Sequence, residues 1–316
     1  MVDQPNRKGQ GYLNLARYTV TYSKYHIKNN IMQTNITPLY RSRQRSNLIG
    51  LVLSMSAMAL GLIALVWILF VLFSNGFAAL EPSLFTQDTP APGSEGGGLR
   101  NAIVGSLMIV GLAVLVSTPI GVLAGVYLTE YGDNSKTAEF TRFVTDIMLS
   151  APSIVLGLFV YAIAVRTVGH FSGYAGSLAL SLIAIPVVMR TTENMLRLVP
   201  GSLREAAFAL GAPRWKVATM VSLRAARSGV MTGLLLAIAR ISGETAPLLF
   251  TALNNQFFST SMESPMANLP VVIFQFAMSP YDNWINLAWG GALLITLTVL
   301  ALNILARVFF RNKVRT

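Results

Sequence analysis

Long apolar runs alternate with short polar connections along the chain, and this pattern predicts membrane-spanning helices. Each of six apolar runs reaches the roughly 20 residues that a helix needs to cross the hydrocarbon core of a bilayer. The runs are 48–73, 101–128, 143–167, 173–192, 229–252 and 285–309. Pro152 and Pro186 interrupt the third and fourth runs. We therefore expect an all-α, polytopic integral membrane protein with about six transmembrane helices.

The composition agrees with a membrane protein. Of the 316 residues, 53% are hydrophobic and 12% are charged, whereas soluble domains carry about 25% charged residues. The absence of cysteine excludes a disulfide framework, a thiolate metal site and a Cys nucleophile. His26 and His170 form no metal-binding pattern with neighbouring acids, so we expect no metal site. No GxxxxGK[ST] loop is present to hold the phosphates of ATP.

Basic residues predict the orientation and the division of the chain. Twenty-one of the 24 Lys and Arg fall in connections and tails that six spans would place on one side. The positive-inside rule makes this the cytoplasmic side, with both termini there. The expected parts are a basic tail 1–47, a first span 48–73, an outer loop 74–100, a core 101–309 and a C-terminal tail 310–316. The first span is expected to stay as an anchor, because 1–47 is too long and polar for a secretory signal.

The tails and outer loops leave alternatives open. The tail 1–47 suits an anionic lipid surface, and the alternative is a partly disordered tail that only sets topology. Charge alone would allow nucleic-acid binding, but no recognised binding motif accompanies it, so we expect none. The second outer loop, 253–284, contains no Lys or Arg, and its segment 268–278 is apolar enough for a short interfacial helix. These loops either receive an extracytoplasmic partner or only connect spans.

Charged residues inside the fifth run mark a candidate translocation path. Arg240 and Glu244 are four residues apart, so they share a helix face. A charge near mid-membrane costs at least about 2.5–3.5 kcal/mol unless it is compensated, so this face should line the bundle interior or a water-filled path. Gly243 and Pro247 would act as a helix hinge there. A guanidinium matches the oxygens of phosphate or sulfate, although a purely structural ion pair is the alternative.

Arg190 and Glu193 lie at the inner end of the fourth run. They would either form an inner ring of charge on the same path or mark the water boundary.

A basic segment between the fourth and fifth runs predicts a docking surface. Arg204 to Leu210 favours a helix by propensity. Gly211 is placed as its C-terminal stop and Pro213 as the first residue of the next helix. Apolar knobs and flanking arginines suit an interface, and the alternative is an ordinary amphipathic surface helix.

The residues of this segment resemble the EAA loop of bacterial ABC importer permeases. Glu205, Ala206 and Ala207 match the Glu-Ala-Ala triplet, and Gly211 follows at the family's spacing. Val221 stands where the family has Ile, before Leu223, and Arg224 stands where it has Pro. The resemblance implies a type I permease fold with a coupling loop near 204–224 that docks on a separate ATPase, which would bind ATP and Mg. The chain itself would need no cofactor and would not be an enzyme.

Two further segments sharpen the resemblance over most of 100–309. Residues 191–195 and 239–249, the latter containing Gly-Glu-Thr-Ala-Pro, look like the PstA-type permeases of phosphate ABC importers. That resemblance implies inorganic phosphate as the substrate and the bacterial inner membrane as the location. It also implies a PstC-type permease, a PstB-type ATPase dimer and a periplasmic phosphate-binding protein as partners.

Three other functions remain open from the sequence. One is import of another oxyanion, such as sulfate, molybdate or phosphonate. A second is ion-coupled secondary transport with Glu244 as the proton carrier. The third is a regulatory membrane scaffold that senses phosphate through a signalling partner without moving it.

Overall fold

The computed structural model describes residues 38–132 and 135–309, and these residues form helices and connections without a strand. The chain divides into two units, Met1–Leu69 and Phe70–Thr316. Most of the predicted tail 1–47, with His26, and the tail 310–316 lie outside the described residues. Five helices are long and apolar enough to cross a membrane, or six if one bent pair is counted, which confirms the expected all-α membrane protein.

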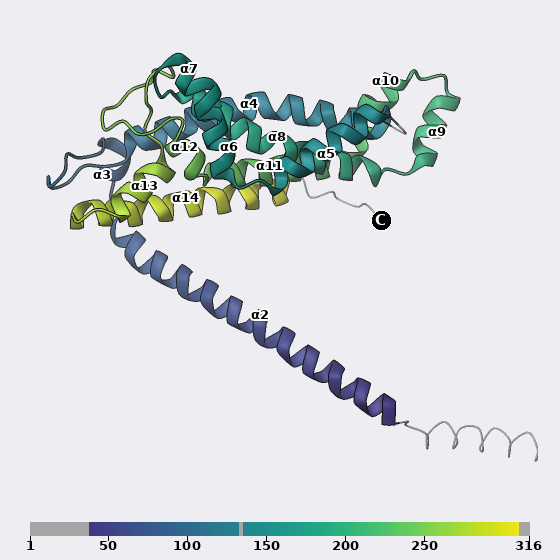
Figure 1. The fold of residues 1–316 in the computed structure, drawn as a ribbon, viewed down its shortest axis with the longest axis horizontal. Coiled ribbons are helices and arrows are strands. Elements are labelled where there is room, and N and C mark those ends of the chain that lie inside the picture. Colours follow the sequence, from purple (N-terminus) through teal and green to yellow (C-terminus); the bar gives the residue numbers. More distant parts are fainter. Residues whose placement is uncertain (1–37, 133–134, 310–316) are drawn as a thin grey trace, which may run out of the picture. The chain divides into compact units, whose positions relative to one another are not determined.

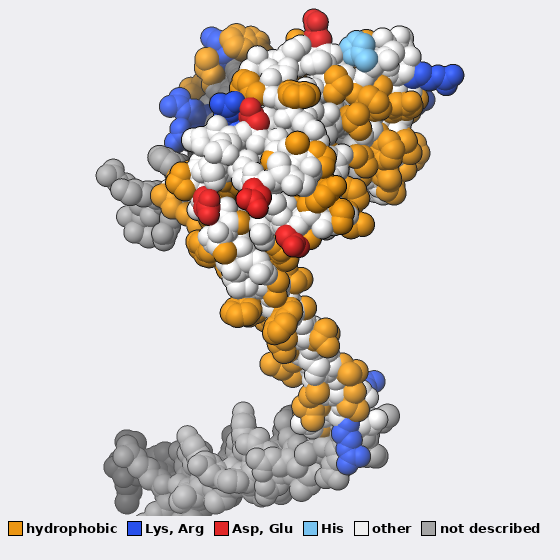
Figure 2. All heavy atoms as spheres, turned by 90° about the vertical axis from the view of Figure 1, so that its left-hand side faces the viewer, with side chains coloured by type: hydrophobic (Ala, Val, Ile, Leu, Met, Phe, Trp, Pro, Cys, Tyr) orange, Lys and Arg blue, Asp and Glu red, His pale blue; other side chains and the backbone are white. Residues whose placement is uncertain are grey.

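The first unit contains most of one long apolar helix, α2 (Pro38–Ala78). Hydrophobic side chains cover the visible face of this helix (Figure 2). The helix extends beyond the predicted span 48–73 at both ends. Pro38 suits the first position of a helix, and the residues that follow it are mostly good helix formers. Helix α2 therefore includes residues 38–47 of the predicted tail and 74–78 of the predicted outer loop.

The second unit is a bundle of helices (Figure 1). Its elements, with the π-helical turns η1 and η2, are α3 (Ser83–Thr86), α4 (Arg100–Glu130), α5 (Lys136–Ser150), α6 (Ser153–Val160), η1 (Tyr161–Val165), α7 (Arg166–Val168), α8 (Gly173–Arg197), α9 (Gly201–Ala209), α10 (Arg214–Lys216), η2 (Val217–Ser222), α11 (Leu223–Ser242), α12 (Ala246–Leu249), α13 (Leu269–Ala277) and α14 (Asp282–Phe309). The bundle has an α9 end, with α9 and α10, and an α13 end, with α3, α7 and α13 (Figure 1).

Helices α4 and α8 pack closely along the bundle. A Cβ atom on Gly121 would lie 2.7 Å from the Val188 Cβ, and one on Gly125 would lie 2.7 Å from the Thr192 Cβ. These small residues let the two backbones approach. The Ser177 hydroxyl also donates to the carbonyl of Ile109, 3.0 Å away. The α4–α8 pair is therefore joined by both packing and interhelical hydrogen bonding.

The predicted third span, 143–167, is not one straight helix. Helices α5 and α6 meet at Ala151 and Pro152, and the chain bends there by 106°. Both residues have extended ψ angles, 136° and 134°. The residue before a proline is pushed away from the helical region by the proline ring, which explains the break. The span is therefore a bent pair whose first half begins at Lys136.

The predicted fifth span, 229–252, is shifted in the structure. A continuous helical path runs from Arg214 through η2 and α11 to Ser242, and it ends there. Residues 243–245 separate it from the short helix α12. The sequence contains no proline between 214 and 242, so no proline interrupts the helix before it ends at Ser242.

The α13 end of the bundle is built from the outer loops. Helix α13 confirms the expected short apolar helix, and the Asn268 side chain caps it by accepting from the Val271 N–H, 3.2 Å away. Phe276 is buried and stacks on Trp284 of α14, with ring centroids 4.3 Å apart. Acidic side chains are spread over this end in Figure 2. The two predicted outer loops thus lie together at this end, where Leu84 of α3 and Phe276 of α13 share one buried cluster.

Candidate functional site

The predicted path residues lie where α11 ends. Arg240 is in the last turn of α11, and Gly243 follows the final residue of that helix as its C-cap. Pro247 stands in the first turn of α12, where its missing N–H costs no helical hydrogen bond. A Cβ atom on Gly157 would lie 2.6 Å from the Pro247 Cα, so α12 packs directly on α6. The predicted hinge therefore coincides with a real break in the helix.

This break lies at the middle depth of the bundle. Ile241, the residue after Arg240, belongs to the same buried cluster as Ile183 and Ala184. Those residues are at the centre of α8, which runs from Gly173 to Arg197. The end of α11 thus packs against the middle of α8. The predicted depth of Arg240 in the membrane stays a prediction.

Arg240 and Glu244 form a loose pair. The Arg240 Nε and the Glu244 Oε1 are 3.8 Å apart, which exceeds hydrogen-bonding distance. The Arg240 side chain is 45% exposed and that of Glu244 is 16% exposed. Leu236, one turn earlier on the same face of α11, is also exposed. A charge on such a face at this depth must be covered by water or by another protein subunit in a membrane.

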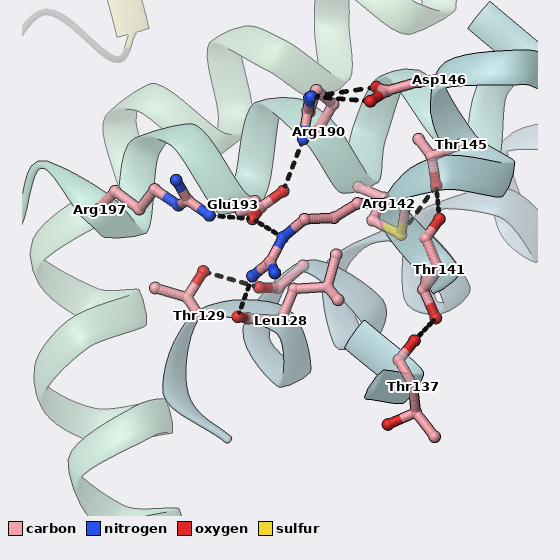
Figure 3. A network of polar contacts seen from close by, with 12 residues as sticks. Leu128, Thr129, Thr137, Thr141, Arg142, Thr145, Asp146, Arg190, Glu193 and Arg197 are labelled. Atoms are coloured by element: carbon pink, nitrogen blue, oxygen red, sulfur yellow. Dashed lines mark hydrogen bonds and ion pairs between the residues drawn. The ribbon is translucent and has the colours of Figure 1, made fainter. Parts of the chain in front are cut away.

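The second predicted pair belongs to a network of arginines around one buried carboxylate (Figure 3). Glu193 is only 1% exposed, and three guanidinium groups reach it. The distances to its carboxylate oxygens are 2.7 Å from Arg142, 2.6 Å from Arg197 and 3.2 Å from Arg190. A buried carboxylate is stable only with such partners.

This network connects three helices. Arg142 comes from α5, and besides pairing with Glu193 it donates to the carbonyl of Leu128 in α4, 2.9 Å away. Arg190 extends the network to Asp146 of α5, at 3.0 Å. None of the ion pairs in the described residues joins this network to Arg240 or Glu244, so the four predicted path residues form two separate sites. Their role in a path stays a prediction.

The sequence interpretation missed three members of this network. Arg197 lies four residues after Glu193, so helical spacing was a usable signal. Arg142 and Asp146 lie on a different helix, 51 residues and 44 residues from their partners in α8. A single sequence gives no signal for contacts over such separations.

The predicted docking segment has the expected helix–turn–helix form. Helix α9 carries the triplet, of which Glu205 and Ala206 are exposed and Ala207 is half-buried. Gly211 has a φ of +79°, which confirms it as the left-handed stop after α9. Pro213 is the N-cap of α10 rather than its first residue. The large apolar side chains exposed on and beside this segment are Leu203, Phe208, Leu210 and Trp215.

Comparison with known proteins identifies the family. The sequence family described as "Binding-protein-dependent transport system inner membrane component" matches residues 117–315, which is more than half of the chain. The chain belongs to this family. Its described membrane spans and the exposed α9–α10 segment are consistent with a permease component.

Relatives in the family extend over nearly the whole chain. The phosphate transport system permease protein PstA of Yersinia pestis is 59% identical over 271 residues, covering 86% of this chain and 92% of that protein. The PstA of Haemophilus influenzae is 58% identical over 282 residues, covering 89% and 100%. PstA 1 of Mycobacterium tuberculosis is 35% identical over 274 residues, covering 85% and 90%.

Solved structures show that this family member has the fold of ABC importer permeases. A chain of a bacterial alginate ABC transporter superposes with a TM-score of 0.61 at 14% identity, covering 89% of this chain and 99% of that one. A chain of the inward-facing MetNI methionine ABC transporter gives a TM-score of 0.53 at 19% identity, covering 67% and 92%. At these identities the likeness concerns the fold alone.

Proposed function

We propose that this chain is the permease subunit of an ATP-driven importer of inorganic phosphate. The observation that carries the proposal is the relationship to phosphate transport permeases, at 58–59% identity across 86% and 89% of the chain. The broken helix at mid-depth supports a translocation role, because irregular backbone inside a membrane is tolerated where it lines a cavity or is covered by protein.

Arg240 is the proposed anion contact on the path. Its guanidinium can take two oxygens of a phosphate dianion in a bidentate arrangement. The Glu244 carboxylate, 3.8 Å away, neutralises Arg240 when the path is empty. Because the two side chains are too far apart for a hydrogen bond, an incoming anion has no strong interaction to break. Glu244 would also repel the dianion and so limit how tightly it is held.

The segment α9–α10 is the proposed contact with a PstB-type ATPase dimer. Its exposed apolar side chains offer anchors for a groove on that partner. ATP and Mg would be bound by the ATPase, and this chain would contribute no catalytic group. Movement of α9 when the ATPase closes would then change the arrangement of the spans, opening the path to one side of the membrane at a time.

The remaining partners follow from the same proposal. The exposed face of α11 with Leu236 and Arg240 would be covered by a PstC-type permease. A periplasmic phosphate-binding protein would deliver phosphate to the acidic α13 end, and the α9 end would lie in the cytoplasm. The protein would then reside in the bacterial inner membrane with both termini in the cytoplasm.

The substrate is tested by uptake into proteoliposomes that contain the assembled complex. The ATPase faces the lumen with trapped ATP, and the binding protein and labelled phosphate are outside. We expect uptake that excess unlabelled phosphate suppresses and excess sulfate leaves unchanged. Suppression by sulfate would move the substrate to another oxyanion, and a complex that binds its partners but imports no phosphate would favour a scaffold.

A further inference from the structure

Arg204 folds back from the docking segment toward the spanning helices. It lies in α9, directly before Glu205, and its side chain is 20% exposed. Its Nε donates to the Oε1 of Glu130, the last residue of α4, at 3.0 Å. Its two terminal nitrogens donate to the carbonyls of Val199 and Leu196, both at 2.8 Å. One side chain therefore joins α9 to the ends of α4 and α8.

All three acceptors lie at or just after the carboxyl end of a helix: Glu130 ends α4, Leu196 is in the last turn of α8, and Val199 follows the C-cap of α8. The carboxyl end of a helix carries a partial negative charge on its last carbonyls. The carbonyl of Leu196 also accepts from the Val199 N–H, 3.1 Å away. Glu130 adds a full negative charge at the carboxyl end of α4, where the helix dipole disfavours it, and it is only 9% exposed. The two carbonyls and the carboxylate thus form a negative pocket that favours a cation. The planar, forked guanidinium of Arg204 satisfies all three acceptors together, which a lysine ammonium on one flexible stem cannot do.

The helices that Arg204 holds are already joined to each other. Gly121 and Gly125 bring α4 against α8 along the same half of the bundle. In the part of the chain that the structure describes, the side-chain hydrogen bonds from α9 to α4 and α8 all come from Arg204. A displacement of α9 would therefore act on this guanidinium, together with the short connection 198–200 and the packing of α9 on η2.

We propose that Arg204 is a positioning residue that transmits the movement of α9 to the α4–α8 pair, with Glu130 as its charged partner. This inference rests on the proposed function, since it assigns the mechanical link between the ATPase and the spans. It predicts that loss of the link leaves docking and ATP hydrolysis in place and reduces the phosphate imported for each ATP hydrolysed.

The first test measures ATP hydrolysis and phosphate uptake in the same proteoliposomes containing the full complex. For Arg204→Ala we expect uptake per ATP to fall about tenfold, within the usual range of coupling between sites. Arg204→Lys should recover only part of this loss, because one ammonium replaces a three-way fork. The matched control is Arg166→Ala, which removes an exposed arginine at the α13 end and should leave the ratio unchanged.

Glu130→Gln keeps the proposal testable if Arg204→Ala prevents assembly. It keeps the shape and one acceptor oxygen but removes the charge, so we expect a loss of about threefold in uptake per ATP, at the low end of such coupling. An unchanged ratio in both the Arg204→Ala and Glu130→Gln complexes would overturn the proposal. If Arg204→Ala does not assemble, an unchanged uptake per ATP in the Glu130→Gln complex would overturn the proposal.

A second test is independent of transport. Because the chain contains no cysteine, Ser202→Cys and Tyr131→Cys place one spin label on α9 and one just after α4. In the complex with native Arg204, the distance between the labels should be the same without nucleotide and with ATP bound. In Arg204→Ala it should shift or broaden with ATP, and identical distributions in both backgrounds would overturn the link. If the unmodified complex shows no ATP-dependent uptake, the proposed function fails, whereas this distance still reports on Arg204.

Discussion

At the residue scale, the two predicted ionic sites differ in how firmly their charges are held. The carboxylate of Glu193 is buried, and three arginines reach it within 3.2 Å. The Arg240 guanidinium is half-exposed, and its partner Glu244 is 3.8 Å away. A charge that is fully hydrogen-bonded stabilises one arrangement of helices, whereas a loosely paired charge remains free to bind a ligand. This contrast supports a structural task for Glu193 and a ligand-binding task for Arg240.

Substitution of Arg240 should reduce transport without preventing assembly. Arg240→Gln removes a charged hydrogen-bonding group, typically equivalent to about 1.5–3 kcal/mol, so the initial rate of phosphate uptake should fall at least about tenfold. The uptake rate should fall less in Arg240→Lys, because lysine keeps the charge but loses the bidentate geometry. Arg166→Gln, at the exposed α7 position, is the control. Normal uptake by Arg240→Gln would remove Arg240 from the path.

Substitution of Glu193 should reduce stability. Glu193→Gln leaves three arginines around a neutral amide, and we expect a loss of about 1.5–3 kcal/mol in the free energy of unfolding. Asp146→Asn is the matched control, because the Asp146 side chain is 54% exposed and, among the described residues, pairs only with Arg190. Its loss should stay below about 1 kcal/mol. Thermal unfolding of the purified complex in detergent measures the stability loss of each variant. Equal midpoints for the two variants would contradict the assigned difference.

At the element scale, the helices depend on small residues at particular contacts. Helix α4 contains Gly121 and Gly125 where α8 approaches, but it also contains Gly111, where an added Cβ would meet no atom within 4 Å. The same residue type in one helix therefore serves close packing against α8 at Gly121 and Gly125 and meets open space at Gly111. This difference gives a comparison in which only the surroundings of the glycine change.

Alanine at these glycines should have opposite effects. In Gly125→Ala the new methyl group would lie 2.7 Å from the Thr192 Cβ and 2.8 Å from the Met189 carbonyl oxygen, and such overpacking costs about 1–3 kcal/mol. In Gly111→Ala the methyl group meets open space, and the helix should gain up to about 1 kcal/mol. Unfolding of the two variants under the same detergent conditions measures the difference. Destabilisation by Gly111→Ala as large as that by Gly125→Ala would contradict the α4–α8 contact.

The elements also show how far one sequence leads. Apolar runs predicted the spans, Gly211 predicted the stop after α9, and 268–278 predicted the short helix α13, because each is a local effect of hydropathy or backbone freedom. The 106° bend at Pro152 had a local signal as well, but a single apolar run obscured it. The contacts of Glu193 with Arg142 and of Glu130 with Arg204 join residues 51 and 74 positions apart, and only tertiary packing determines them.

At the scale of the whole molecule, charge distinguishes the two ends of the bundle. Arg190, Arg197 and Arg204 lie toward the α9 end, whereas Figure 2 shows acidic side chains over the α13 end. The positive-inside rule then predicts that the α9 end faces the cytoplasm, where an ATPase has access to ATP. The charged ends and the proposed coupling segment therefore require the same orientation.

Labelling of single cysteines tests this orientation. Ser202→Cys lies on α9 and Phe257→Cys lies in the loop at the opposite end, where Phe257 is 80% exposed. In right-side-out vesicles a membrane-impermeant maleimide should label residue 257 and not residue 202, and inverted vesicles should give the reverse. Labelling of both positions from one side would contradict the topology.

The energy source of uptake tests the central claim most directly. Proteoliposomes with the assembled complex and the binding protein are loaded with ATP, with a non-hydrolysable analogue or with no nucleotide, and phosphate uptake is followed with and without a protonophore. We predict uptake only with hydrolysable ATP and no effect of the protonophore. Uptake without ATP that the protonophore abolishes would contradict an ATP-driven permease and favour an ion-coupled transporter.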